Sequence, residues 1–586
     1  MEAYYQDYYT RLADKLNSGE IIKDIPNWIC RNTRLNGVPY TFKDHEFQIA
    51  ILKDQAQESD TMKCSQVGLT EAQLRFVMAY MQVKQQVTAI YVMPTMNDAK
   101  KITKSRIDPI IESSPMLAAS VRAGTDSATM KQFGLSFLHI GGAESTRGGI
   151  STPAQVLIID EYDFCNPRVL GIYNSRTRHA QDRMLKRRFS TPTVSNYGIA
   201  LNYSRSDMHR YQCKCLYCNT WQAPDFFKQV VIPGFDKSFE EFDVDDLVND
   251  SYKIASAYIR CTHCGKELDK SLAIAAQREW VAAMPSRSAR GWSVRPFDLI
   301  AYNTTSRVIE QLKDYTTRQD YYNFVHGLPL DTDENKINDK MVLSCCVGDW
   351  VDEGKGWYIG IDVGKVCHIV VGRKINGKKH VVWFGKLRIS EGSLITQIAA
   401  LVERFNFERI VIDHGPDVSI PAGLQDKFGS DVVHPCVYVK GRKDRPDWLD
   451  LKDDTGFVNV ARTRGIDACV QSINAGKWIF PRTEKMEEVR KHLQQMVRIE
   501  KDDDNEGDMV AVWEKATDSD HYFHAIVYLN TAMEMDEGAY STGVTIAPTS
   551  ILGVSVGAGY LESIRRNAPQ SSQHSELAGM FGRMRS

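Results

Sequence analysis

Apolar runs alternate with helical stretches from about residue 40 to about residue 200. VTAIYVMP at 87–94 and VLIID at 156–160 are continuous apolar segments of strand length. Such runs are typical of strands buried on both faces, and their alternation with helices favours a largely parallel sheet covered by helices. The pattern predicts an α/β domain over residues 41–330, preceded by a polar or helical segment at 1–40.

A second α/β pattern follows a polar segment at 331–355, which we interpret as a linker. Three strands are predicted to begin at 357, 368 and 380. A helix follows, with Leu394, Ile395, Ile398, Leu401, Val402 and Phe405 on one face, and then the strand RIVID from 409. The order β-β-β-α-β defines a second domain over 356–536. The Gly-, Ser-, Ala- and Pro-containing residues 537–586 predict a flexible tail.

The composition is that of a folded protein with more than one core. The chain has 586 residues, of which 43% are hydrophobic and 25% charged. Lys+Arg 72 against Asp+Glu 74 implies that any polyanion is bound by local patches. The sequence shows neither a long apolar span nor the apolar core of a signal peptide, so we expect a cytosolic protein without a membrane role. In a reducing compartment, clustered cysteines among the 13 are read first as metal ligands.

KCSQVGLT at 63–70, directly before a helix, is a degraded phosphate-binding loop. Gly68 and Thr70 fit the pattern GxxxxGK[ST], but Lys63 occupies the first glycine position and Leu69 replaces the usual lysine. A glycine turn at a helix N-terminus binds phosphate through backbone N–H groups and the helix dipole. Lys63 could bring its ammonium to the phosphates, since it acts as a point charge. The alternative is a plain strand-turn-helix.

Two carboxylates end an apolar strand about ninety residues later, where VLIIDEYDF places Asp160 and Glu161. An NTPase needs one carboxylate for Mg²⁺ and a second to orient or deprotonate the attacking water. Further on, Ser190 and Thr191 in RRFSTPTV resemble the sensor strand of helicase-like ATPases. Arg147, between glycines in GGAESTRGGIS, could stabilise charge on a transferred phosphoryl group, or it is a solvated loop residue.

Two CxxC pairs predict a structural zinc site. Each pair presents two thiolates on a tight turn, and two pairs complete a tetrahedral site. The spacing of the pairs is long, so residues of about 205–285 are expected to form a zinc-binding insertion, in which Cys213 or His263 could replace a ligand. The predicted ligands are Cys215, Cys218, Cys261 and Cys264.

Three aspartates of the second half predict a nuclease centre. Asp362 ends the first strand and Asp413 the fourth, and these strands can lie side by side and parallel. A later helix begins near Asp518 and Asp520, of which one can face the other two carboxylates; we expect Asp520, with Asp518 as the helix cap. Converging carboxylates can hold two Mg²⁺ or Mn²⁺ ions for phosphodiester cleavage.

An ATPase with this phosphate loop, followed by a ribonuclease-H-like nuclease, resembles the large terminase subunit of tailed bacteriophages and related viruses. The similarity is to the branch whose loop begins with lysine and which carries CxxC pairs after the sensor strand, and it covers about residues 40–535. It implies a motor that uses ATP to drive double-stranded DNA into a procapsid and cuts concatemeric DNA. It also implies the portal protein, the small terminase subunit and a ring of five copies as partners, in the host cell cytoplasm.

The resemblance assigns roles to the residues already named. Lys63, Gly68 and Thr70 would bind phosphates, Asp160 would hold Mg²⁺, and Glu161 would be the catalytic carboxylate. Ser190 and Thr191 would couple hydrolysis to movement, Gln48 would contact adenine, and Arg147 would act in the ring. The nuclease carboxylates would be Asp362, Asp413 and Asp520, and the cofactors ATP, Mg²⁺ or Mn²⁺, and Zn²⁺.

Two other classes of function remain open at this point. A repair or recombination ATPase with a nuclease would need a second helicase core, and no second phosphate-binding half is found between 205 and 355. A zinc-containing DNA-binding scaffold would explain the cysteines but would leave Asp160, Glu161 and the three later aspartates without a role.

Overall fold

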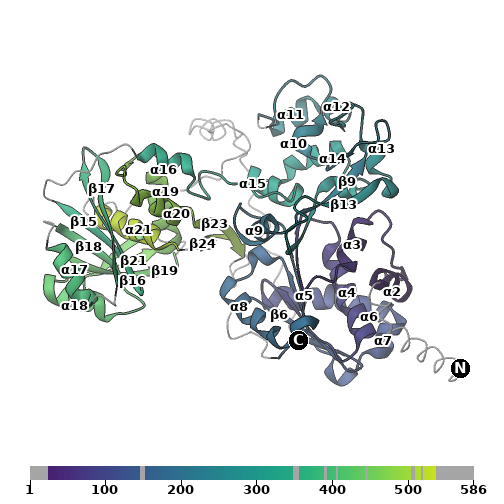
Figure 1. The fold of residues 1–586 in the computed structure, drawn as a ribbon, viewed down its shortest axis with the longest axis horizontal. Coiled ribbons are helices and arrows are strands. Elements are labelled where there is room, and N and C mark those ends of the chain that lie inside the picture. The colour runs from purple at the N-terminus through teal and green to yellow at the C-terminus, as the bar shows by residue number, and fades with distance from the viewer. Residues whose placement is uncertain are drawn as a thin grey trace, which may run out of the picture.

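The computed structural model describes residues 24–144, 152–239, 241–346, 356–388, 392–403, 407–441, 447–452, 454–502, 509–516 and 519–535. These residues form two lobes, each built around its own sheet (Figure 1). Among the described helices, none combines the length and the apolar character needed to cross a membrane.

The first lobe contains a ten-stranded sheet in the order β10-β9-β14-β3-β8-β7-β4-β6-β5, with β13 paired to β9. Its strands are β3 (Glu58–Lys63), β4 (Thr88–Met93), β5 (Met130–Phe133), β6 (Ser136–Gly142), β7 (Val156–Asp160), β8 (Leu185–Ser190), β9 (His209–Lys214), β10 (Trp221–Gln222), β13 (Arg278–Ala282) and β14 (Arg290–Val294). The pairings from β14 to β6 are all parallel. The predicted parallel α/β sheet is therefore confirmed, and β4 and β7 coincide with the two apolar runs.

Helices cover the parallel central part of this sheet, because parallel neighbours need crossover connections over the faces. They are α2 (Ile25–Asn32), α3 (Phe47–Lys53), α4 (Leu69–Lys84), α5 (Met96–Ile102), α6 (Asp108–Ser113), α7 (Pro115–Ser120), α8 (Pro167–Arg176), α9 (Gly198–Arg205), α10 (Phe226–Gln229), α11 (Val244–Asn249), α12 (Ser251–Ile254), α13 (Asp269–Leu272), α14 (Thr305–Glu310) and α15 (Arg318–Asp320). Helix α4 is buried along nearly its whole length, and the charges of its buried Glu71 and Arg75 are paired with each other.

The segment predicted as an insertion contributes to the main sheet. Strands β10 and β13 each pair antiparallel with β9 at one edge, and β9 also pairs with β14. Two short strands, β11 (Val230–Val231) and β12 (Tyr258–Ile259), form a separate pair. The cysteine-bearing turns thus extend directly from the sheet that carries the phosphate loop.

The second lobe contains an eight-stranded sheet in the order β20-β21-β19-β18-β15-β16-β17-β22. Its strands are β15 (Trp357–Asp362), β16 (Val366–Ile375), β17 (Lys378–Arg388), β18 (Phe407–Asp413), β19 (Val433–Val439), β20 (Leu449–Lys452), β21 (Phe457–Ala461) and β22 (Trp478–Ile479). Strands β15, β16 and β17 are antiparallel neighbours, while β18 lies parallel to β15, as predicted. This arrangement is ribonuclease-H-like.

Each face of the second sheet carries its own core. The helices are α16 (Asp339–Cys345), α17 (Leu394–Val402), α18 (Ser419–Phe428), α19 (Arg462–Asn474), α20 (Lys485–Leu493) and α21 (His521–Glu534). Successive residues of β15 point to opposite faces, so Tyr358 packs in the α21 core and Ile359 in the α17–α18 core. Helix α16 belongs to the first of these cores. It lies within the segment interpreted as the linker, whose boundaries stay a prediction.

A hairpin of the second lobe, β23 (Met496–Asp502) with β24 (Met509–Lys515), reaches towards the first lobe (Figure 1). Its Val497 and Ile499 pack against Val194 and Tyr197, which follow the sensor strand β8. The backbone N–H of Arg498 also donates to the carbonyl of Asn335 at 2.8 Å. The two lobes are thus joined by direct packing as well as by the chain between them.

Candidate functional site

The carboxyl ends of three parallel strands bring the predicted nucleotide residues together. Lys63 ends β3, Asp160 ends β7 and Ser190 ends β8, and β8 lies between the other two strands. Ligands of open parallel sheets bind at the carboxyl ends of the strands, so the fold places these side chains at the expected edge. Gly68 begins the turn into α4 with φ 69°, a left-handed conformation that glycine adopts without strain.

Lys63 forms an ion pair with Glu161. Its Nζ lies 2.8 Å from Glu161 Oε1, and Lys63 itself is buried. Burial disfavours the ammonium, but the charges of Glu161 and Asp160 outweigh burial and raise the pKa of Lys63 above its usual value. The lysine at the start of the loop therefore carries its charge directly to the carboxylate pair.

Asp160 is held by two hydroxyl groups. Thr70 Oγ1 donates to its Oδ2 at 2.9 Å, and Tyr91 OH donates to the same oxygen at 2.8 Å. Burial, together with the charge of Glu161, raises the pKa of Asp160 to about 6. Leu69, which stands where most such loops have lysine, lies in the hydrophobic core. Within the described loop, Lys63 is thus the residue that can offer a cation to a phosphate.

Three predicted nucleotide residues each keep one buried polar atom without a hydrogen-bond partner among the described residues: Gln48 Oε1, Asp160 Oδ1 and Thr191 Oγ1. Buried polar atoms are nearly always paired in folded proteins, so a cluster of unpaired ones indicates a ligand site. The free oxygen of Asp160 beside the Thr70 hydroxyl fits a Mg²⁺ ligand pair, because Mg²⁺ prefers oxygen ligands. Gln48 Nε2 donates to the carbonyl of Val67 at 2.7 Å, which ties Gln48 to the loop.

A cavity of about 650 Å³ opens beside the loop. His45, Gln66 and Tyr302 line it together with residues of α14 and the turn after it. The rings of His45 and Tyr302 lie 5.7 Å apart, and the Tyr302 side chain is half exposed. The lining is otherwise mostly polar, and these two rings beside the phosphate loop make the cavity a candidate nucleoside pocket. The wall opposite Gln66 comes from α14 and the turn after it, which the sequence analysis did not connect with the phosphate loop.

The segment after β14 supports the phosphate loop from behind. The N–H of Cys64 donates to Val294 O, and that of Ser65 donates to Phe324 O at 2.7 Å. Gly327 has φ 59°, and a Cβ there would lie 2.5 Å from Cys64 N. Arg295 Nη1 donates to the carbonyl of Gly327 at 2.9 Å. Sequence analysis missed this support because it lies more than 220 residues from the loop.

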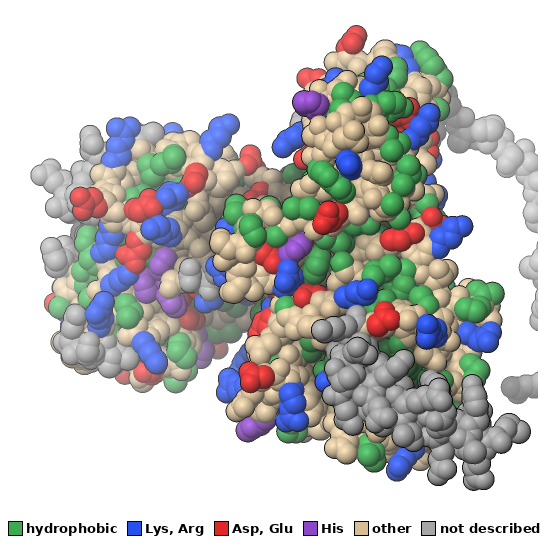
Figure 2. Space-filling view, turned by 45° about the vertical axis from the view of Figure 1, so that its right-hand side comes forward, with side chains coloured by type: hydrophobic (Ala, Val, Ile, Leu, Met, Phe, Trp, Pro, Cys, Tyr) green, Lys and Arg blue, Asp and Glu red, His purple; other side chains and the backbone are tan. Residues whose placement is uncertain are grey.

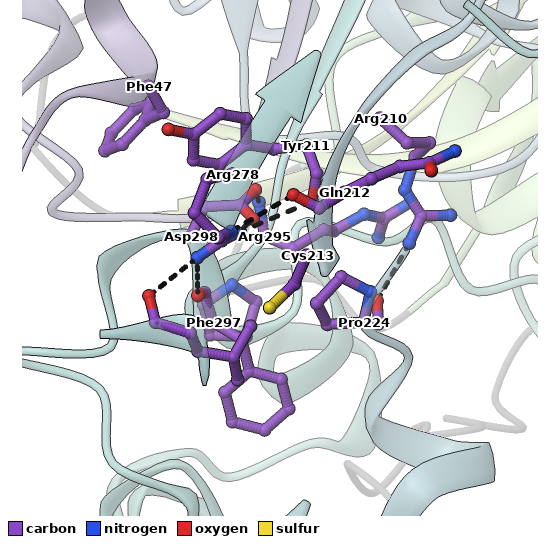
Figure 3. Close-up of polar contacts among 12 residues, drawn as sticks. Phe47, Arg210, Tyr211, Gln212, Cys213, Pro224, Arg278, Arg295, Phe297 and Asp298 are labelled. Carbon is purple, nitrogen blue, oxygen red and sulfur yellow. Dashed lines mark hydrogen bonds and ion pairs between the residues drawn. The ribbon is translucent and has the colours of Figure 1, made fainter. Parts of the chain in front are cut away.

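Buried Arg278 of β13 connects the edge strands β9 and β13 to the same support (Figure 3). Arg278 Nη2 lies 2.7 Å from Asp298 Oδ1, and its Nη1 donates to the carbonyl of Phe297. Its guanidinium also lies 4.3 Å from the Tyr211 ring centroid. A buried charge persists where it is paired and hydrogen-bonded, and this one is both. It connects β9 and β13 to the turn that carries Arg295 and Asp298.

Asp163 connects the carboxylate turn to the sensor region. Its carboxylate accepts hydrogen bonds from the N–H of Thr193, the Thr193 hydroxyl and the N–H of Ile199, at 3.1, 3.1 and 2.6 Å. Burial raises its pKa to about 7. The preceding Glu161 has a left-handed backbone, φ 50°, which non-glycine residues rarely adopt. Asp163 therefore fixes the turn that presents Glu161, a role not anticipated from the sequence.

The four predicted cysteines converge. Their Sγ atoms all lie within 4.8 Å of one another, with Cys215 and Cys264 at 3.8 Å and Cys218 and Cys261 at 3.7 Å. Zn–S bonds of about 2.3 Å in a tetrahedron separate sulfurs by about 3.8 Å, so the cluster fits one zinc ion. Cys213 lies outside this group, and its Sγ contacts the carbonyl of Lys214.

In the second lobe, Asp362 and Asp413 end adjacent parallel strands. The register pairs Ile361 with Ile412, so the two aspartates occupy the next positions along. Burial, and then the charge of Asp362, raise the pKa of Asp413 to about 6. Two carboxylates kept this close repel each other unless a cation lies near them, which is the electrostatic character of a metal site.

Helix α21 begins at His521, so its N-cap position is occupied by Asp520 and not, as predicted, by Asp518; Asp520 pairs with Lys515 and His524. Its carboxylate lies 3.2 Å from Lys515 Nζ and 3.5 Å from His524 Nε2. Burial acts to raise its pKa, but His524 and Lys515 hold the pKa of Asp520 well below its usual range. Among the described residues, the ligand atoms that gather around Asp362 are those of His368 and His521, and neither Asp413 nor Asp520 belongs to that group. Asp518 and Arg147 lie outside the described residues.

Two histidines that the sequence analysis did not select lie against Asp362. His521 Nδ1 is 2.8 Å from Asp362 Oδ2, and the rings of His521 and His368 stack at 4.7 Å. Burial, followed by the charges of His521 and Lys386, lowers the pKa of His368 to about 4. His368 follows Asp362 by six residues, across the turn between two antiparallel strands. This spacing alone does not reveal that the two residues are paired, because it does not fix the register of the strands.

The site and fold of the first lobe define an ATP-hydrolysing domain with a phosphate loop and a carboxylate strand. Residues 36–280 match the family model described as phage terminase large subunit gpA, ATPase domain. Residues 36–280, which make up most of the first lobe, are thus similar to the ATPase domain of phage terminase large subunits. No curated protein sequence matches the chain.

Several solved structures of large terminases are similar to the chain at low sequence identity. The HK97 bacteriophage large terminase is 10% identical with a TM-score of 0.48, over 87% of this chain and 98% of that one. A large terminase from a thermophilic bacteriophage is 12% identical with a TM-score of 0.28, over 82% of this chain and 94% of that one. The large terminase nuclease of the thermophilic phage G20c is 11% identical with a TM-score of 0.23, over 34% and 99%.

Proposed function

We propose that the chain is a viral genome-packaging motor that hydrolyses ATP to move double-stranded DNA into a procapsid and cuts concatemeric DNA with a metal-dependent endonuclease. The observation that carries the proposal is the ATPase-domain match over residues 36–280, with Lys63, Asp160 and Glu161 meeting at one sheet edge. The ribonuclease-H-like order of the second sheet supports the nuclease half.

For ATP hydrolysis, each residue has a physical role. Lys63 neutralises phosphate charge, and Gly68 lets the backbone of the turn approach the phosphates. Glu161 orients water and accepts its proton, since it is the carboxylate that lies beyond the Asp160 ligand position. Ser190 Oγ donates to Glu161 Oε2 at 3.4 Å and, with the neighbouring Thr191, senses the γ-phosphate. Gln48 accepts from the amino group of adenine through its free Oε1.

Two metal ions complete the first lobe. Thr70 and Asp160 are proposed to hold Mg²⁺, which when bound neutralises the charge between the terminal phosphates. Cys215, Cys218, Cys261 and Cys264 are proposed to hold Zn²⁺. With four protein ligands, that zinc site would be closed and structural, and it would fix the outer strands β9 and β10 near the loop support.

In the second lobe, we assign Asp362, Asp413 and Asp520 as the nuclease carboxylates, with Mg²⁺ or Mn²⁺. Ions bound there would activate water and stabilise the leaving oxygen of a phosphodiester. Asp520 has to leave its ion pair with Lys515 to bind a metal directly. The substrate bonds of such a centre are the phosphodiesters of DNA. The visible surface carries interspersed basic and acidic side chains rather than one large patch of a single charge (Figure 2).

The proposed assembly is a ring, of five copies, on the portal protein, with the small terminase subunit as the DNA-recognition partner and the host cell cytoplasm as its location. The near-zero net charge of −2 suits a motor that must both grip and release DNA. Arg147 is proposed to act on the γ-phosphate of the neighbouring copy, since a glycine-flanked arginine can reach across an interface.

A test of the proposed function measures three activities of the full chain: ATP hydrolysis with and without double-stranded DNA, ATP-driven displacement of a DNA triplex, and plasmid cutting in Mn²⁺. We expect DNA to stimulate hydrolysis, Glu161→Gln to stop hydrolysis and displacement while cutting continues, and Asp362→Asn to stop cutting alone. ATP hydrolysis without any triplex displacement, alone or with procapsids, would reject the motor. Cutting unchanged by Asp362→Asn would reject the nuclease assignment.

A further inference from the structure

Three ligand groups meet at the end of β15 in the second lobe. Asp362 on β15 pairs directly with His368 on the antiparallel strand β16, so both side chains lie on the same face of the sheet. Helix α21 crosses β15 at Gly360, where a Cβ would lie 2.1 Å from the carbonyl oxygen of Ala525. This close approach brings the first residue of α21, His521, to Asp362.

The ligand atoms of Asp362, His368 and His521 all lie within 4.8 Å of one another. His521 Nδ1 is 2.8 Å from Asp362 Oδ2, a contact that an ordinary ion pair would explain. His368 is not explained in that way. It is 4% exposed, its Nδ1 has no hydrogen-bond partner among the described residues, and its ring stacks on that of His521. A buried imidazole nitrogen without a partner, beside a carboxylate and a second imidazole, is the donor set of a metal ion.

We propose that Asp362, His368 and His521 bind one divalent transition-metal ion through one carboxylate and two imidazoles. The inference rests on the proposed nuclease and changes its chemistry. A site of carboxylates alone suits Mg²⁺ and Mn²⁺, whereas imidazole ligands favour first-row transition metals such as Fe²⁺, Ni²⁺ and Zn²⁺, and Mn²⁺ binds such a mixed site more weakly. Asp413 and Asp520 lie outside this ligand group and remain with the second ion of the proposed pair.

Ligation by nitrogen can be observed directly, apart from activity. The full chain, carrying zinc at its cysteines, is loaded with less than one equivalent of Mn²⁺. Pulsed electron paramagnetic resonance then detects ¹⁴N coupling from imidazole. We expect this coupling in the wild type and in His380→Gln, a matched change at the far end of the β16–β17 pair. We expect it to disappear in the His368→Gln, His521→Gln double variant.

Binding of Mn²⁺, measured by calorimetry, gives the second readout. Each single change, His368→Gln or His521→Gln, is expected to raise the Mn²⁺ dissociation constant by about 10- to 100-fold or more, the loss seen even when a group that only orients a ligand is removed. His521 begins a helix and is partly exposed, so His521→Gln is expected to keep the fold if His368→Gln does not. Circular dichroism and thermal unfolding of each variant check this.

The outcomes separate the inference from the proposed nuclease. Mn²⁺ binding and DNA cutting without ¹⁴N coupling would overturn the histidine ligands and leave the nuclease standing. Nitrogen coupling without cutting in any metal would reject the nuclease and leave the metal site. Absence of Mn²⁺ binding to the folded wild type, or coupling that persists in the double variant, would also overturn the proposed ligand set.

Discussion

Lys63 Nζ lies 2.8 Å from Glu161 Oε1, so the cation of the phosphate loop and the proposed catalytic carboxylate neutralise each other across two strands. Phosphates arriving at the loop compete with Glu161 for the same ammonium. Because Lys63 has one charge to offer, nucleotide binding is expected to release Glu161 towards water. The position of lysine at the start of the loop therefore couples phosphate binding to the state of the catalytic carboxylate.

The first prediction concerns Lys63. Lys63→Ala removes the cation, and Leu69 is buried in the core and supplies no replacement. We expect the KM for ATP to rise, kcat to fall, or both, by about tenfold or more, since a charge-assisted contact contributes about 1.5–3 kcal/mol. Steady-state kinetics measures both constants. The exposed Lys84, at the end of α4, provides the control Lys84→Ala, and kinetics equal to those of wild type in Lys63→Ala would show that another basic residue serves the phosphates.

The second prediction separates binding from chemistry. Glu161→Gln should retain affinity for ATP but lower kcat by about 10²–10⁴-fold, because the amide cannot accept the proton of water. Equilibrium binding of a fluorescent ATP analogue beside a phosphate-release assay gives the two quantities. Glu279→Gln on β13, an exposed position, is the matched control. Normal turnover in Glu161→Gln would move the catalytic role to another carboxylate.

The third prediction tests the aromatic cavity. Tyr302→Ala should raise the KM for ATP by about 5- to 100-fold with little change in kcat, because stacking on a base contributes about 1–3 kcal/mol to binding and not to the chemical step. The comparison is Tyr252→Ala, on α12, where the tyrosine is 71% exposed. If Tyr302→Ala binds ATP as tightly as wild type, the base lies elsewhere and the cavity serves another ligand.

The sequence predicted the elements that have their own local pattern. The apolar runs became β4, β7 and β15, and KCSQVGLT lies at the junction of β3 and α4, because such signals are local. It did not reveal Arg295, Gly327 or Tyr302, which meet the loop only after β14 pairs with β3. Contacts of that kind depend on strand order and register, which hydrophobic periodicity does not encode.

The helix carrying Asp520 shows the same limit. The choice between Asp518 and Asp520 assumed that both residues lie in the first turn of the helix, whereas α21 begins only at His521. In the structure α21 is buried almost all around, so periodicity could not assign its faces. His521 is a candidate metal ligand because β15 and β16 bring Asp362 and His368 to it. The sequence of its own helix does not reveal these neighbours.

The fourth prediction concerns the cysteines. Protein purified without added metal should contain about one zinc per chain, and Cys261→Ser should lose most of it and unfold at a lower temperature, since structural zinc contributes folding free energy. Elemental analysis and thermal unfolding measure these effects. Cys30, half-buried and outside the cluster, supplies the control Cys30→Ser. If folded wild-type protein contains far less than one zinc per chain, the four cysteines do not form a zinc site.

The last prediction distinguishes a catalytic Asp520 from a structural one. Asp520 ends the turn into α21 and pairs with Lys515 and His524, so a purely structural role predicts that Asp520→Asn lowers the unfolding temperature and the cutting rate together. A catalytic role predicts that Mn²⁺-dependent cutting disappears at a nearly unchanged unfolding temperature, with ATPase activity intact.

We expect the catalytic result. Asp362 and Asp413 end the adjacent strands β15 and β18, and a third carboxylate helps to balance the charge of two bound ions. Asp518→Asn serves as the neighbour control and should leave cutting in place. Plasmid digestion, ATP hydrolysis and thermal unfolding of both variants decide the matter. If cutting stops in Asp518→Asn and continues in Asp520→Asn, the catalytic role belongs to Asp518. The contacts of Asp520 with Lys515 and His524 would then have only a structural function.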